Sequence, residues 1–164
     1  MARPSEPDAD LDDALRLLHF AFRTVTARAD AALAKRGYGR THHRILYFIR
    51  REPGQSVATL LATLGVTKQS LHAPLQQLVR AGLVAKTRSV ENGRVKELAL
   101  TPRGRTLEAS LSGPQRSLFA SAFAGAPAAS VAGWRAVMVA LGGKQLRLAT
   151  RRNRGRRSGR VSDS

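Results

Sequence analysis

The chain has 164 residues, of which 43% are hydrophobic, and a formal net charge of +17 at pH 7. This length is enough for one domain with a buried core, and the composition argues against wholesale disorder. The absence of cysteine excludes disulfides, thiolate metal sites and thiol redox chemistry within this chain. No apolar run approaches the roughly 20 residues that span a bilayer, and the acidic N-terminus does not resemble a signal peptide, so a cytoplasmic location is expected.

The positive charge lies away from the N-terminus. Six acids and four bases leave residues 1–30 at −2, whereas five acids and 24 bases leave residues 31–164 at +19. Such an imbalance predicts a polyanionic partner, with nucleic acid favoured and an anionic membrane surface second. The alternative is that the arginines reflect the codon usage of a GC-rich genome, because a high isoelectric point by itself identifies no site.

The N-terminal third predicts a loose arm and two helices. Residues 1–10 hold two prolines and three acids and are expected to be disordered. From Leu11 the apolar residues recur in steps of four and three, which predicts a long amphipathic helix to about Lys35. Thr41 is expected to cap a second helix, and "REPGQ" then predicts a turn.

The middle of the chain predicts two short helices and a hairpin. Ser56 can cap the helix "VATLLATL", which Gly65 closes, and Thr67 can cap another that runs to about Arg80. "GLVAKTRS" and "RVKELAL" predict two strands, joined by a hairpin turn at 91–93. The link between the two helices is therefore only residues 65–67.

The C-terminal third predicts two more helices and a tail. Thr101 and Pro102 mark a helix start, and a last helix follows Pro127, with Gly142 and Gly143 weakening its end. Residues 150–164 hold six arginines and are expected to be disordered. The predicted fold is mainly α with a small β-hairpin wing (α+β).

The helix from Thr67 has a polar leading edge and an apolar back. In a helix-turn-helix the second helix lies in the major groove of DNA and its first residues meet base edges. Glutamine can pair with adenine, lysine can reach guanine, and serine or threonine can serve either. The predicted base-reading residues are Thr67, Lys68, Gln69, Ser70 and His72. The alternative is an ordinary solvated first turn.

Other polar residues are suited to the DNA backbone. The hairpin adds a wing that carries Arg88, Arg94 and Lys96, and arginine at a wing tip can enter the minor groove. Thr41 and Arg44 are predicted phosphate anchors at the start of the second helix. The adjacent His42 and His43 point about 100° apart on a helix, so they do not converge on one metal ion. Capping of the helix or a phosphate contact is favoured for them over a metal. No metal site or other cofactor is expected.

The segment "LLATLGVTKQSLHAPLQQLVRAGLV" followed by "NGRVKELALTPRGR" resembles the MarR-type winged-helix regulators. The resemblance covers about 41–111 and implies homodimers that bind double-stranded DNA at a pseudo-palindromic operator, often as repressors released by a small ligand. It divides the chain into a winged helix-turn-helix at 41–101 and dimerisation helices at 11–36 and 102–149, together one domain at 11–149. It implies base-reading roles for the residues named above and a minor-groove role for Arg94.

The sequence departs from the family pattern at two positions. The family commonly has Asp two residues before the wing arginine, where this chain has Asn92, which cannot form the bracing ion pair. Pro74 lies inside the recognition helix, where it lacks an N–H and is expected to kink the helix.

A ligand pocket and the tail are further expectations. A small-molecule effector is expected between the dimer helices and the winged helix, near His19, Phe22, His43 and Tyr47. The simpler interpretation of His19 is a packed or interfacial histidine. The arginine-rich tail either serves as a solubility tail or adds nonspecific phosphate contacts.

No pattern in the chain favours an enzyme. It lacks G-x-S-x-G, a phosphate-binding glycine loop and H-E-x-x-H. The sequence therefore predicts a sequence-specific transcriptional regulator. The alternatives are a nonspecific architectural DNA-binding protein, a protein-interaction module, and a sensor for which a small ligand is the main input.

Overall fold

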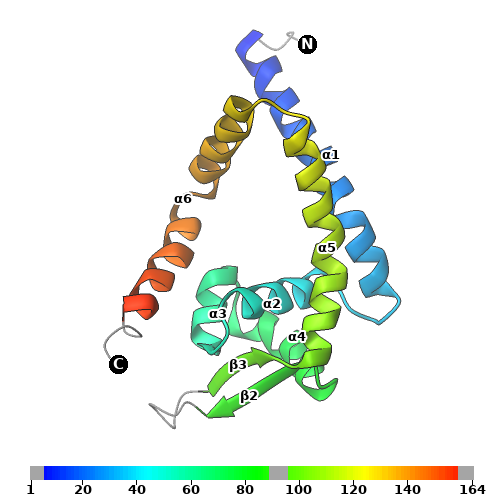
Figure 1. Cartoon of the computed structure of the whole chain (residues 1–164), viewed down its shortest axis with the longest axis vertical. Helices are drawn as coiled ribbons and strands as arrows, with labels where there is room; N and C mark the ends of the chain where they lie inside the picture. Colours follow the sequence, from blue (N-terminus) through cyan, green and yellow to red (C-terminus); the bar gives the residue numbers. More distant parts are fainter. Residues whose placement is uncertain (1–5, 89–95, 159–164) are drawn as a thin grey trace.

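The computed structural model describes the backbone of residues 6–88 and 96–158 and the side chains of residues 9–88 and 96–143. Figure 1 shows two long helices lying together, a third long helix on the opposite side, and a compact unit of short helices and strands between their lower ends. The elements are α1 (Glu6–Ala34), α2 (Arg40–Arg51), β1 (Gln55–Ser56), α3 (Val57–Leu64), α4 (Lys68–Arg80), β2 (Val84–Arg88), β3 (Lys96–Leu100), α5 (Pro102–Ala124) and α6 (Ala128–Ser158). The predicted fold class is confirmed.

Helix α1 begins earlier than the sequence suggested. It is helical from Glu6, so the expectation of disorder is wrong for residues 6–10. Pro7 falls in the first turn, where its missing N–H costs nothing. Residues 1–5 lie outside the described part of the chain.

Helix α2 also begins earlier than expected, because its start is capped by Gly39 together with His42 and not by Thr41. Gly39 is the N-cap residue, not Thr41. The N–H of Gly39 donates to Nδ1 of His42 at 3.0 Å, so the third residue of the helix reaches back to its cap. This moves the start of α2 to Arg40.

The predicted ends of α3 and α4 are confirmed. The Ser56 Oγ accepts from the Thr59 N–H at 3.1 Å, and the Thr67 Oγ1 accepts from the Ser70 N–H at 3.2 Å. Gly65 closes α3 at φ 63°, a left-handed conformation in which glycine carries no Cβ penalty. Residues 65–67 therefore form the short turn of a helix-turn-helix.

The wing is part of a three-stranded antiparallel sheet in the order β1–β3–β2. The two long strands pair from Val84 with Leu100 to Arg88 with Lys96. The sequence missed β1, which lies at the end of "REPGQ" and pairs Gln55 with Leu98. The predicted turn at 91–93 lies outside the described residues.

One core unites the helix-turn-helix, the sheet and the lower halves of α1 and α5. Helix α4 buries one side against α2, while α5 contacts α1, α2 and β3. The buried apolar residues are Ala29, Leu33, Ile45, Leu46, Ile49, Leu60, Leu71, Leu75, Leu78, Leu83, Val84, Leu98, Leu100, Leu107 and Leu111. This core fixes the position of α4 relative to the long helices.

The start of α5 is joined directly to the end of the helix-turn-helix. The Thr101 hydroxyl donates to the Gly82 carbonyl at 2.7 Å and accepts from the Gly104 N–H at 3.0 Å. A Cβ on Gly104 would lie 2.0 Å from the Leu83 carbonyl oxygen, so only glycine allows this approach. The start of α5 is therefore packed directly on the segment that follows α4.

Helix α6 is broken where two glycines were expected to weaken it. Gly143 has non-helical φ 47° and ψ −130°, and Figure 1 shows the two helical segments on either side. The second segment continues to Ser158, so the expected disorder of 150–164 is wrong for 150–158. Arginine is a good helix former, which is consistent with this extension. Residues 159–164 lie outside the described part.

Within the described residues, no helix is both long and apolar enough to cross a bilayer.

Candidate DNA-binding surface

Helix α4 has the two-sided character that its sequence predicts. The five predicted base-reading residues, Thr67, Lys68, Gln69, Ser70 and His72, are all exposed. Leu71, Leu75 and Leu78 on the opposite side are buried. The helix is therefore anchored from behind while its polar edge faces solvent.

The exposed residues differ in how much hydrogen-bonding capacity they retain. The Thr67 hydroxyl donates to Ser70 Oγ at 3.1 Å, and the Ser70 hydroxyl donates to the Thr67 carbonyl at 3.0 Å. Lys68, Gln69 and His72 make no such bonds to other described residues. Because the two hydroxyls stabilise the helix start, the latter three side chains are the better candidates for contacts with bases.

The same side of α4 continues beyond the residues that the sequence singled out. Ala73, Gln76 and Arg80 follow Gln69 at intervals of four, seven and eleven residues, so they share its side of the helix. Ala73 and Arg80 are exposed and Gln76 is half-buried. These three positions can be identified from the sequence by counting along the helix from Gln69 in steps of three and four residues.

Pro74, where a kink is expected, lies inside α4, which is one helix from Lys68 through to Arg80. Proline has no N–H to offer the Ser70 carbonyl, so one helical hydrogen bond is missing between the first and second halves of α4. The two halves of the recognition helix are therefore held together less firmly than in an uninterrupted helix.

The strands place two of the three predicted wing cations opposite each other. Arg88 and Lys96 are paired across β2 and β3, and both are exposed. On the same sheet, partial burial and the charge of Lys96 lower the pKa of Lys86. Arg94 and Asn92 lie outside the described residues, so their predicted roles rest on the sequence alone.

At the start of α2, some polar side chains are exposed and others are already hydrogen-bonded within the protein. Arg44 is exposed and Thr41 is half-buried. The neighbouring Arg40 binds Asp30 of α1 through Nε and Nη2, the latter at 2.7 Å, and its guanidinium lies 4.9 Å from the ring centre of Phe22. These hydrogen bonds with Arg40 lower the pKa of Asp30. Of the basic residues here, Arg44 is thus the one most available to a phosphate.

The four residues of the predicted ligand pocket lie on α1 and α2, and three of them are exposed. His19, Phe22 and Tyr47 are exposed, whereas His43 is half-buried. The His43 Nε2 lies 2.9 Å from Ser112 Oγ of α5. Burial lowers the pKa of His43, although the charges of Glu108 and Asp30 partly oppose this shift. The described contacts do not bring the four side chains together around one cavity.

A buried carboxylate lies next to this histidine. Glu108 of α5 is fully buried, and its Oε2 accepts from Arg50 Nη1 of α2 at 2.5 Å. The Arg116 Nη1 lies 3.7 Å from the other oxygen, Oε1, which has no hydrogen-bond partner among the described residues. No local sequence pattern indicates this ion pair between α2 and α5, because its partners are 58 positions apart.

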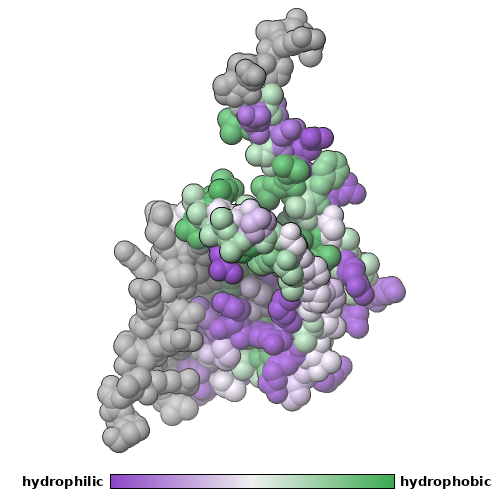
Figure 2. Space-filling view, turned by 45° about the horizontal axis from the view of Figure 1, so that its top comes forward, coloured by the Kyte–Doolittle hydropathy of each residue, from purple (hydrophilic) through white to green (hydrophobic). Residues whose placement is uncertain are grey.

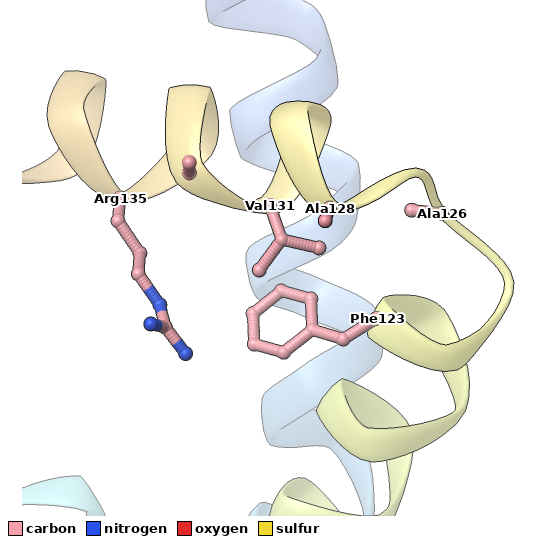
Figure 3. A pocket seen from close by; sticks show the side chains of 6 residues that line it. Phe123, Ala126, Ala128, Val131 and Arg135 are labelled. Carbon is pink, nitrogen blue, oxygen red and sulfur yellow. The ribbon is translucent and has the colours of Figure 1, made fainter.

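A cavity of about 420 Å³ lies elsewhere, at the turn between α5 and α6. Figure 3 shows Phe123 beneath Val131, with the Arg135 side chain extending from the next turns of α6. Ala126, Ala128 and Ala132 complete the lining, which includes none of the predicted pocket residues.

Comparison with known proteins agrees with this arrangement. The model of the MarR family matches residues 36–95. The HTH-type transcriptional regulator PetP of Rhodobacter capsulatus is 42% identical over 134 residues, which cover 82% of this chain and 81% of PetP.

Two further proteins extend the comparison. The HTH-type transcriptional repressor Rv2887 of Mycobacterium tuberculosis is 34% identical over 91 residues, covering 56% of this chain and 66% of Rv2887. The crystal structure of the MarR family transcription regulator SP03579 has a TM-score of 0.68 at 24% identity and covers 88% of this chain and 95% of that one. The latter supports the fold.

Proposed function

The chain belongs to the MarR family of transcriptional regulators, and from this premise we propose that it is a homodimeric repressor that binds a pseudo-palindromic operator. Lys68, Gln69 and His72 read bases, with Thr67 and Ser70 shaping the helix start. Arg94 of the wing enters the minor groove. Arg88 and Lys96 of the wing, together with Thr41 and Arg44 of α2, contact the DNA backbone. Two recognition helices would meet half-sites about one helical turn, roughly 10 bp, apart.

The observation that carries the proposal is the contrast between the two sides of α4. Three leucines hold the helix in the core, while Lys68, Gln69 and His72 are exposed and make no hydrogen bonds to other described residues. A helix that only packed would not need this unused polar edge. Basic residues of α2 and the wing supplement it, as a polyanion requires.

The exposed apolar surface of the long helices supports a dimer. Leu15 of α1 is 66% exposed, Leu18 is 49% exposed and Leu141 of α6 is 68% exposed. Figure 2 shows hydrophobic side chains gathered on the projecting part of α1 and on the neighbouring helices. A patch of this kind favours association, because burying it removes apolar area from water. The same helices of a second copy offer a matching surface.

A small-molecule effector completes the proposal. The solved structure of Rv2887 in complex with p-aminosalicylic acid is 27% identical, with a TM-score of 0.53, and covers 78% of this chain and 97% of that one. We propose by analogy that a small ligand bound near His19, Phe22, His43 and Tyr47 releases the repressor. The connection of α5 to the end of α4 through Thr101 gives such a ligand a route to the reading helix.

The competing function is nonspecific, architectural DNA binding driven by the net charge of +17. Charge alone would bind any duplex and would weaken steeply with salt. It would not require the polar leading edge of α4.

The test is a binding selection from genome fragments with the purified chain at about 150 mM salt, where the Debye length is roughly 8 Å. Recovery of one shared palindromic site would support the regulator. Recovery of fragments without a common site would contradict it and favour the architectural function.

A further inference from the structure

His42 is a buried polar residue that the DNA-binding surface does not itself use. It lies at the third position of α2 and is 8% exposed. Its ring stacks on Tyr38, with 4.7 Å between the ring centres and 25° between the planes. The side chain is therefore held in one orientation.

Both ring nitrogens of His42 are engaged. Nδ1 accepts from the Gly39 N–H at 3.0 Å, so in the neutral imidazole the proton is on Nε2. Nε2 lies 2.5 Å from Oε1 of Gln77 and can donate to it. One end of the ring thus caps α2 while the other end is bonded to the recognition helix.

The position of Gln77 means that this hydrogen bond connects α2 to the second half of the recognition helix. Gln77 lies on the flank of α4 between the buried leucines and the side that carries Gln69, three residues after Pro74. The missing N–H of Pro74 removes the helical bond to Ser70. One helical hydrogen bond fewer joins the two halves of α4, and the bridge from His42 to Gln77 ties the second half, with Gln76 and Arg80, to the start of α2.

We propose that His42 is a positioning residue for sequence recognition, which acts through Gln77. It fixes the recognition helix relative to the start of α2, where Thr41 and Arg44 are proposed to hold phosphates. The phosphate contacts set the register of the protein on DNA, so the bridge sets where the side chains of α4 meet the bases. This inference rests on the proposed operator-binding function.

A positioning role has a different signature from a stabilising role. Loss of folded protein lowers the apparent affinity for every DNA sequence alike. Loss of position lowers the affinity for the selected site and leaves binding to unrelated DNA nearly unchanged, because phosphate contacts tolerate a small rotation of α4 better than base contacts do.

The experiment compares four variants with the unaltered chain. Gln77→Leu removes the acceptor and leaves the cap of α2 intact. His42→Asn leaves an oxygen near the Nδ1 position for the Gly39 N–H but is too short to reach Gln77. The third variant combines both changes. Ser112→Ala is the matched control, because it removes the neighbouring His43–Ser112 contact between α2 and α5 without touching α4.

Affinities are measured for the consensus duplex selected by the unaltered chain and for a shuffled duplex of the same composition. Each single variant should lower the ratio of the two affinities about three- to tenfold, the range expected for one hydrogen bond. The double variant should lose no more than the larger single loss, and Ser112→Ala should keep the ratio. Thermal midpoints of all variants verify that the compared proteins are folded.

The outcomes distinguish a failure of this inference from a failure of the proposed operator-binding function. If the unaltered chain prefers its consensus duplex and either single variant keeps the full ratio, or the two losses multiply, His42 does not position α4 through Gln77. If the unaltered chain selects no consensus at all, the operator-binding function is wrong and there is no specificity for His42 to support.

Discussion

The ion pair between Arg50 and Glu108 should respond asymmetrically to removal of its two partners. Glu108 is fully buried, whereas the Arg50 side chain is 45% exposed. Arg50→Ala leaves the buried carboxylate with Arg116, 3.7 Å from Oε1, as its remaining ion-pair partner among the described residues. Glu108→Gln instead leaves an arginine that water can solvate and an amide oxygen that can still accept its hydrogen bond.

These differences set the expected magnitudes. Stranding a buried charge costs about 3–5 kcal/mol, and the nearby Arg116 favours the lower end of that range for Arg50→Ala. Replacing a charged acceptor by a neutral one costs about 1–2 kcal/mol, so Glu108→Gln should be the milder change. Arg50→Ala should therefore lower the free energy of unfolding by about 1–3 kcal/mol more than Glu108→Gln.

The assay is urea unfolding followed by circular dichroism, with all chains at one concentration because stability and association are linked in an oligomer. Equal losses for the two variants, or a greater loss for Glu108→Gln, would refute the reasoning. Either result would mean that leaving the buried carboxylate without Arg50 is not the larger of the two costs.

Three further predictions concern the junctions and the long helices. The pKa of His43 is lower in the folded protein than its unfolded value near 6.5. At a pH between these two values, His43 is more protonated in the unfolded state than in the folded state. The free energy of unfolding should therefore rise as the pH rises through this range. Urea titrations across this range should show a smaller slope for His43→Gln, and an unchanged slope would contradict the assignment. Gly104→Ala places a Cβ against the Leu83 carbonyl, so it should lower the free energy of unfolding by about 1–3 kcal/mol or more. The matched control is Gly113→Ala, whose Cβ would meet no atom of another part of the chain within 4 Å. This control should be neutral or stabilising in the same unfolding assay. Leu15→Ser with Leu18→Ser should shift sedimentation towards the monomer without unfolding the winged helix, because both residues are exposed in the single chain; a dimer of unchanged strength would place the interface elsewhere.

The elements that were predicted well are those whose signals are local. Ser56, Thr67 and Thr101 cap helices because their hydroxyls accept from N–H groups three residues later, and that spacing is visible in the sequence. The alternation of buried and exposed residues along α4 follows directly from helical periodicity.

The features that were missed depend on contacts between distant residues. Thr41 is a good cap in isolation, but His42 reaches back to Gly39 and is itself held by Gln77, 35 positions away. Strand β1 forms because Gln55 pairs with Leu98 of the wing. No local sequence pattern indicates this pairing. The Arg50–Glu108 pair likewise joins α2 to α5 across 58 positions. Such pairings depend on tertiary packing, which a single sequence does not display.

The most direct test of the account is the specificity of DNA binding after the polar edge of α4 is changed. Gln69→Ala and Lys68→Ala are compared with the unaltered chain on the selected duplex and on a shuffled duplex at about 150 mM salt. The account predicts that Gln69→Ala lowers the ratio of affinities by a factor equivalent to about 1–3 kcal/mol, while Lys68→Ala also weakens binding to the shuffled duplex because it removes a positive charge. Retention of the full ratio by both variants would contradict the claim that this edge reads DNA.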